Sequence, residues 1–239
     1  MNIKSYYNFI FTVILLINCN LYSQNKIEDL FDTTVGKENL PLNNGVFYFN
    51  TLKTLNTHQF YHSNKYSSEN LIYDNQFYNT VNLKYDSYRD VLVFKPYGES
   101  ENFGIVLIQQ KVSKFTLNNR NFVNLSLVTN DSLRDVKGYY EENIRGKYFT
   151  FYIKHKKDRR EFIKNQVTYT DFEIYNEFLI FKDDSYFPIK SKNNVTSLFP
   201  TLKKEINTFY NDNSKLSKDN KTEFYEKLFR FIDQLTFTK

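Results

Sequence analysis

The chain has 239 residues, which is enough for one large β domain or two small ones. Its formal net charge is only +5, and a charge this small does not indicate nucleic acid, so we expect no nucleic-acid partner. Aromatic residues make up 18% of the sequence, and such large side chains prefer strands, which favours sheets around a bulky core.

The first 23 residues predict a signal peptide. Lys4 supplies the positive start, the run 9–17 (FIFTVILLI) is apolar, and Leu21 to Ser23 form a small-residue exit. The apolar run is too short to span a bilayer. We therefore expect cleavage after Ser23 and a mature chain that begins at Gln24, exported to the periplasm or associated with the outer membrane.

A lipoprotein is the alternative that Cys19 raises. Asn18 stands before this cysteine, where a lipoprotein signal has a small residue, so the sequence disfavours lipid attachment. Cleavage after Ser23 removes Cys19, which is the single cysteine of the chain. The mature chain can then hold no disulfide bond, and its stability must come from packing.

Residues 24–190 predict one antiparallel β domain, and the stretch from Gln76 to Pro96 is its clearest part. Between residues 77 and 85 apolar and polar side chains alternate, which is the two-residue period of a strand. The run 91–94 (VLVF) is apolar on both faces, as in a central strand. Asp86 and Asp90 provide turn chemistry between them, because an aspartate can accept hydrogen bonds from backbone amides two residues on.

Short apolar or alternating runs, separated by turn residues, predict the other strands. Strands of this length and spacing are typical of antiparallel sheets that form a sandwich or a partial barrel. The expected strands cover residues 46–49, 71–73, 104–112, 115–117, 122–128, 138–140, 147–154, 161–163, 167–172, 177–181 and 186–189.

After residue 190 the period changes to that of a helix. Apolar residues recur four apart between Leu198 and Tyr210 and three or four apart between Phe224 and Leu235, so residues 191–239 predict two amphipathic helices joined by a polar loop at 211–220. A helix pair with one apolar face needs a partner, and we expect it to pack on the sheet. The predicted fold class is mainly β, an antiparallel sandwich or partial barrel with a C-terminal pair of amphipathic helices.

Several short motifs resemble those of a known group of proteins. They are the stretch 81–86 (VNLKYD) followed by 90–93 (DVLV), the stretch 138–140 (GYY) followed by 146–147 (GK), and the ending with 198–200 (LFP) and 203–206 (KKEI). With them the chain resembles an uncharacterised family of exported flavobacterial proteins. The resemblance covers most of the mature chain and implies export and a β-rich architecture, but the family has no activity or binding residues to carry over.

The densest charge cluster is the basic run at residues 154–160 (KHKKDRR). It predicts contact with an anionic membrane surface or with another protein of the cell envelope. The structural alternative is a hairpin tip that its charges keep soluble and unable to pair edge to edge. His155 lies within the run and is expected to be solvated. The candidate contact residues are Lys154, Lys156, Lys157, Arg159 and Arg160.

His58 and His62 have the spacing of two metal ligands on one helical face, but the segment around them lacks helical character. On a strand the two side chains would stand about 13 Å apart, too far to share one ion. No third ligand stands out nearby. We therefore predict no metal site and no cofactor.

The sequence contains none of the catalytic fingerprints of nucleophilic hydrolases, P-loop enzymes or dinucleotide-binding enzymes, so we predict no catalytic residues. The adjacent acidic pairs Glu141-Glu142 and Asp183-Asp184 do not form natural acid–base couples, because neighbours on a strand point to opposite faces.

Export without catalytic motifs predicts a non-enzymatic binding or scaffold protein of the periplasm or outer membrane. One alternative is a hydrolase of envelope polymers that uses scattered carboxylates such as Asp171, Glu173 and Glu177. Another is a periplasmic lipid-binding protein. An open cleft with two convergent carboxylates would favour the hydrolase, and an enclosed apolar cavity would favour the lipid binder. No pattern in the sequence specifies the ligand or the oligomeric state.

Overall fold

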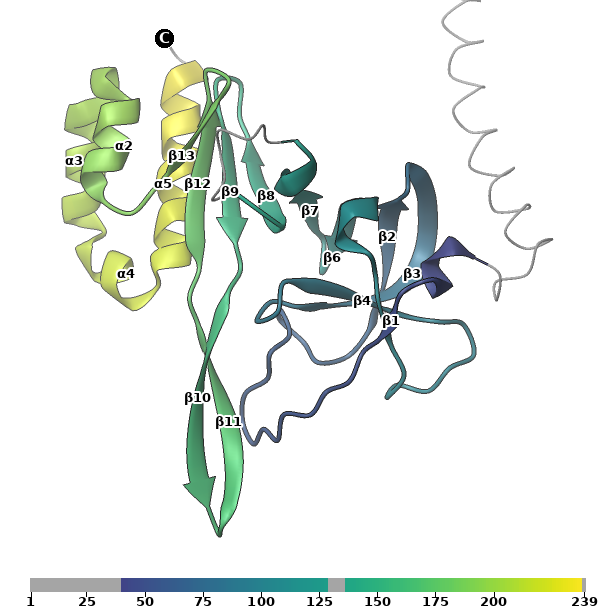
Figure 1. Cartoon of the computed structure of the whole chain (residues 1–239). Coiled ribbons are helices and arrows are strands. Elements are labelled where there is room, and N and C mark those ends of the chain that lie inside the picture. Colours follow the sequence, from purple (N-terminus) through teal and green to yellow (C-terminus); the bar gives the residue numbers. More distant parts are fainter. Residues whose placement is uncertain (1–39, 129–135, 238–239) are drawn as a thin grey trace, which may run out of the picture.

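The computed structural model describes residues 40–128 and 136–237. Within these ranges the chain is mainly β, with eleven strands in one antiparallel sheet, two strands in a separate ribbon and four α-helices near the C-terminus (Figure 1). The sheet is not closed into a barrel. The predicted fold class is confirmed. The predicted signal peptide at residues 1–23, with Cys19, lies outside the described residues.

The large sheet does not follow the chain order throughout. Its strands, from one edge to the other, are β1 (Val46–Phe47), β5 (Ile105–Val106), β4 (Val91–Lys95), β3 (Gln76–Asp86), β2 (Ser67–Tyr73), β6 (Val112–Leu117), β7 (Arg120–Asn124), β8 (Tyr139–Arg145), β9 (Thr150–Lys154), β12 (Glu177–Lys182) and β13 (Ser185–Pro188).

The hairpin of β3 and β4 forms as the alternating pattern predicts. The Asp86 carboxylate accepts hydrogen bonds from the backbone amides of Tyr88 (3.1 Å) and Arg89 (2.9 Å). Asp90 ends the turn with a φ of +57°, a left-handed conformation that aspartate tolerates better than most residues. The two aspartates therefore shape the turn, as predicted.

The strand predicted at residues 104–112 is wrong, because this segment belongs to two strands. β5 pairs with β4, whereas β6 starts at Val112 and pairs with β2 on the far side of β3. The chain must cross the sheet between them, and a short 3₁₀ turn at Gln109–Lys111 makes this crossing. Leu107 is buried on the way, so the apolar run reflects a buried crossing as well as a strand.

The ribbon leaves the sheet between β9 and β12. It consists of β10 (Lys157–Lys164) and β11 (Val167–Ile174), which pair with each other and extend away from the rest of the molecule (Figure 1). Its tip is at Asn165 and Gln166, which both have a positive φ. The basic run lies at the other end of the ribbon, so its interpretation as a hairpin tip is wrong.

Four helices replace the predicted pair. The helices are α2 (Lys192–Leu198), α3 (Lys203–Asp212), α4 (Ser214–Asp219) and α5 (Lys221–Phe237). Pro200 begins a 3₁₀ turn that separates α2 from α3, because proline cannot continue the hydrogen-bonding pattern of a helix. The stretch predicted as a polar loop contains α4, whose Leu216 packs against the helical core.

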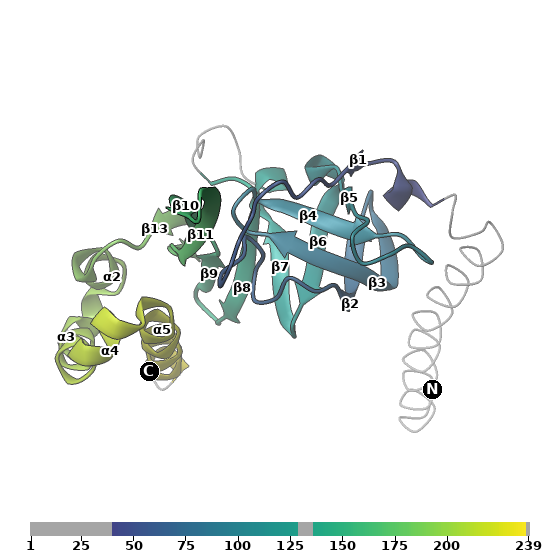
Figure 2. The same cartoon turned by 90° about the horizontal axis from the view of Figure 1, so that it is seen from below.

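The buried side chains form two main clusters on either side of the middle strands. Strands β2 to β7 curl around one cluster, in which Tyr85, Phe115, Phe122 and Tyr139 are in ring contact. The helices cover β9 and β12 around the other cluster. Figure 2 shows the curled strands and the helices on opposite sides of β8 and β9. We call the curled strands β2 to β7 one lobe, and the helices with β9 and β12 the other lobe. The two lobes meet at a junction beside β8 and β9.

Candidate functional site

A pocket with a volume of about 860 Å³ lies at this junction. Five separate segments line it. They are the loop 56–62, the turn at Ser87, the β9–β10 junction at 155–157, the β11–β12 junction at 172–178 and the start of α5 at 219–222. We call it the interlobe pocket. A large concave site at the junction of two lobes is the usual place for a ligand.

Cations outnumber anions in the lining of the interlobe pocket. Lys156, Lys157 and Lys221 line it, against a single acidic residue, Asp219. The chain has three histidines, and all three line this pocket. The start of α5 adds positive potential, because the first backbone amides of a helix have no intrahelical acceptor. The electrostatics of the pocket suit an anion.

Lys157 is the lysine of the pocket whose pKa is shifted most. Its Nζ donates hydrogen bonds to the backbone oxygens of His58 (2.6 Å) and Phe60 (2.7 Å). Burial lowers the pKa of Lys157 to about 8, against a smaller opposing effect of Asp86. The ammonium group of Lys157 therefore connects the loop 56–62 to the base of the ribbon. Asp86 is the acidic residue that partly offsets the effect of burial on its pKa.

His155, in the lining of the pocket, pairs with the buried Glu141, which does not itself line the pocket. The His155 Nε2 lies 2.6 Å from a carboxylate oxygen of Glu141, which is 2% exposed. Burial alone raises the pKa of Glu141, but hydrogen bonds from His155 and Asn143 and the charge of Arg120 together lower it below its ordinary value. The Glu141 carboxylate is therefore charged, and its oxygens already bind neighbouring side chains of the protein.

The prediction that His155 is solvated is wrong. Its side chain is only 12% exposed, and its ring lies 4.5 Å from that of Tyr61, centroid to centroid. Glu141 fixes one ring nitrogen, which leaves Nδ1 for water or a ligand. The prediction that Glu141 and Glu142 point to opposite faces is confirmed, because Glu142 pairs with Arg145 instead (2.9 Å).

The five predicted contact residues do not share one surface. Lys154 is 6% exposed, and its Nζ lies 2.5 Å from Asp90 Oδ2 and 2.6 Å from the backbone oxygen of Lys137. Burial lowers the pKa of Lys154, and Asp90 opposes this effect. Its prediction as a surface contact is wrong, because it is the last residue of β9 and its side chain enters the core side of the β3–β4 turn.

The other four cations lie along the base of the ribbon. Lys156 pairs with Glu177 at 2.8 Å, and both side chains are partly exposed. Arg160 pairs with Glu173 at 3.0 Å on β11, and Arg159 lies over the ring of Tyr88. Lys156 and Lys157 line the interlobe pocket, whereas Arg159 and Arg160 do not.

His58 and His62 belong to an irregular loop rather than to a helix or a strand. The pKa of His58 is lowered, mainly by burial and also by the charge of Lys157. Among residues 40–128 and 136–237, no group of three or more histidine, cysteine or acidic side chains is placed to hold a metal ion. The two histidines act instead as part of the pocket wall.

The carboxylates of the hydrolase alternative each have a different partner. Asp171 accepts a hydrogen bond from Thr57 (2.7 Å), while Glu173 and Glu177 take part in ion pairs with Arg160 and Lys156. None of the three lines the interlobe pocket. They are therefore not arranged as a pair on either side of a bound substrate.

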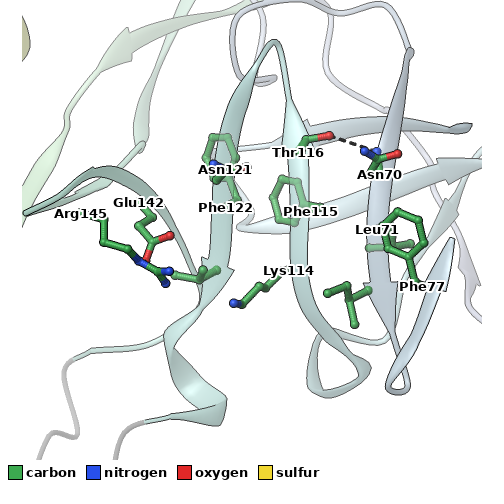
Figure 3. Close-up of a pocket in the computed structure, with 12 residues that line it drawn as sticks. Asn70, Leu71, Phe77, Lys114, Phe115, Thr116, Asn121, Phe122, Glu142 and Arg145 are labelled. Atoms are coloured by element: carbon green, nitrogen blue, oxygen red, sulfur yellow. Dashed lines mark hydrogen bonds and ion pairs between the residues drawn. The ribbon is translucent and has the colours of Figure 1, made fainter. Parts of the chain in front are cut away.

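A smaller hollow of about 320 Å³ crosses β2, β6, β7 and β8 (Figure 3). Its two charged side chains at one end, Glu142 and Arg145, pair with each other. Lys114 is the remaining charged residue of its lining. The hollow carries less charge than the interlobe pocket and lacks its histidines, so we give it no functional role.

No helix in the described part of the chain is long and apolar enough to cross a membrane. Comparison of the chain with protein families, with curated proteins and with solved structures found no match. The resemblance to exported flavobacterial proteins stays a prediction.

Proposed function

We propose that this chain is a non-enzymatic binding protein of the cell envelope, and that the interlobe pocket holds an anionic envelope ligand. One observation carries the proposal. Three lysines and all three histidines of the chain converge on one pocket from three separate segments, against one acidic residue. Placing like charges together costs free energy, and a bound anion would offset that cost.

The carboxylates support binding rather than hydrolysis. A glycoside hydrolase needs one carboxylate to protonate the leaving group and a second to act as base or nucleophile. Glu141 does not line the pocket, and its carboxylate is held by His155, Arg120 and Asn143. Asp219 is then the remaining acidic group of the site, and a single carboxylate cannot fill both roles.

The proposed location is outside the cytoplasm, in the periplasm or at the outer membrane, and it rests on the predicted signal peptide. We expect the protein in the envelope fraction of the native cell, with Gln24 as its first residue. Cell fractionation followed by mass spectrometry of the mature N-terminus measures both. A full-length chain in the cytoplasm would contradict the proposed location, and an acylated Cys19 would replace it with a lipoprotein.

Charge-reversal variants distinguish binding at the interlobe pocket from binding at the ribbon. The double variant Lys156→Glu/Lys221→Glu changes two cations of the pocket, and the matched variant Arg159→Glu/Arg160→Glu changes two cations of β10 outside it. We expect the first to weaken binding to native envelope vesicles by at least about tenfold, or about 1.4 kcal/mol. The second should change it little. Cosedimentation at several salt concentrations measures the binding, which should weaken as salt rises.

Folding should survive in both variants, because partly exposed ion pairs add little to stability. A loss of binding confined to the ribbon variant would place the contact on β10 and contradict the proposed pocket. Equal binding by all three proteins would contradict an anionic ligand altogether.

A further inference from the structure

We infer that the ligand carries a phosphate group, and that the interlobe pocket binds this group through its lysines and the first turn of α5. The inference rests on the proposed function and specifies the chemistry of the ligand. It starts from the kind of cation that the pocket presents. Its cationic side chains are those of Lys156, Lys157 and Lys221, and no arginine lines it.

Lysine and arginine bind anions in different ways. The planar guanidinium group of arginine binds carboxylates and phosphates alike through two parallel hydrogen bonds, whereas a lysine ammonium group acts as a compact point charge and is a common phosphate ligand. A phosphate group accepts hydrogen bonds in several directions and so accommodates ammonium groups from different sides. A lining of three lysines from two segments suits this geometry better than that of a planar carboxylate.

The start of α5 provides donors of a second kind. Asn220 caps the helix, since its side-chain oxygen accepts a hydrogen bond from the Glu223 amide (3.1 Å) and its amide nitrogen bonds the Glu223 carboxylate (3.2 Å). The amides of Lys221 and Thr222 precede the helical hydrogen-bonding pattern and remain for a ligand. Phosphate groups bind at such helix N-termini, where free amides and the helix dipole act together.

A side-chain contact fixes this helix start against the base of the ribbon. Asn176, between β11 and β12, donates a hydrogen bond to the Thr222 hydroxyl (3.0 Å). The helix start and the β9–β10 junction with Lys156 and Lys157 are therefore walls of one pocket that is already assembled. Little ordering remains to be done on binding, which lowers its entropic cost.

The remaining wall suits the organic part of such a ligand. Ile174 and Tyr175 are 74% and 56% exposed and line the same pocket. The ammonium group of Lys156 lies 5.9 Å from the centre of the Tyr175 ring. An apolar or ring-shaped group beside a cationic one fits both a phosphorylated sugar and a phospholipid headgroup, which share the phosphate.

Four soluble probes test the phosphate directly. Inorganic phosphate, glucose 6-phosphate, glucuronate and glucose are titrated into the protein by calorimetry at low salt, and phosphatidylglycerol vesicles form a separate arm. We expect the two phosphates to compete for one site, glucuronate to bind at least about tenfold more weakly, and glucose not to bind. Binding of phosphatidylglycerol vesicles alone would assign the phosphate to a lipid headgroup.

Two lysine variants locate the site. Lys221→Met removes an exposed pocket cation and should weaken phosphate binding at least about tenfold. Lys164→Met, at the exposed end of β10 and outside the pocket, is the matched control and should leave binding unchanged. Equal affinity for glucuronate and glucose 6-phosphate, both sensitive to Lys221→Met, would overturn the phosphate inference and leave the anion-binding function standing. Failure of every anionic probe and of the vesicles would overturn both.

Discussion

Asp90→Ala is expected to destabilise the fold by about 3–5 kcal/mol, because it leaves the buried Lys154 ammonium group without its countercharge. Asp90 also accepts a hydrogen bond from the Tyr85 hydroxyl (2.7 Å), and Tyr85 is fully buried in the centre of the curled strands. The cluster therefore links the β3–β4 hairpin to β9, which β2, β6, β7 and β8 separate from β3 in the sheet. Its loss should weaken the contact between the two lobes.

Equilibrium unfolding in urea measures this effect. Glu173→Ala, which breaks the exposed pair with Arg160, is the control and should cost less than about 1 kcal/mol. The double variant Asp90→Ala/Lys154→Met removes both charges and should recover part of the loss, since a buried charge without a partner costs more than none. A loss below about 1 kcal/mol for Asp90→Ala would show that Lys154 finds another partner or reaches solvent.

Gly138 adds a steric constraint to the same cluster. It has a φ of +81°, and a Cβ at this position would collide with the Asp90 carboxylate and the Lys154 ammonium group. The resemblance motif at residues 138–140 therefore has a physical reason here: only glycine leaves room for the ion pair beside the backbone.

Val93→Asp is expected to destabilise the fold severely, by several kcal/mol, because it buries a charge in a central strand. Val93 is 0% exposed and lies in β4 between β3 and β5, paired with Lys84 and Val106. Val91 begins the same strand and is only partly buried, so Val91→Asp should cost clearly less.

Thermal unfolding of both variants, followed by circular dichroism, measures the difference. Val93→Asp should be largely unfolded at 25 °C or melt far below the wild type, and Val91→Asp should remain folded. Near-wild-type melting of Val93→Asp would contradict the central position of β4. Equal losses for the two would show that Val91 is more enclosed than its position at the turn implies.

The parts of the fold that depend on neighbouring residues could be predicted from the sequence. Alternation defined β3, and turn chemistry at Asp86 and Asp90 defined the hairpin, because both are properties of a few consecutive side chains. The apolar period likewise indicated the helices, although Pro200 and Leu216 divide them differently from the prediction.

The parts that depend on distant partners could not be predicted. The apolar run at 104–112 has the composition of one strand, and only the pairing of β5 with β4 and β6 with β2 divides it. The same holds for the basic run. The residues next to Lys154 in the sequence do not show that its side chain is buried and paired with Asp90. The interlobe pocket has no local signature at all, since its five segments span residues 56–222.

The binding role of the interlobe pocket is tested most directly by the reactivity of its lysines. At pH 8, a lysine with a pKa of about 8 is half deprotonated, whereas an ordinary lysine is less than about 1% deprotonated. Lys157 should therefore react with limiting acetic anhydride well before Lys164, as read by peptide mass spectrometry.

The decisive comparison is the same labelling with and without native envelope vesicles. We predict that the vesicles slow the acetylation of Lys156, Lys157 and Lys221 together and leave Lys164 unchanged. Unaltered rates at the three pocket lysines, or protection that falls on Lys164 instead, would contradict an anionic ligand in the interlobe pocket.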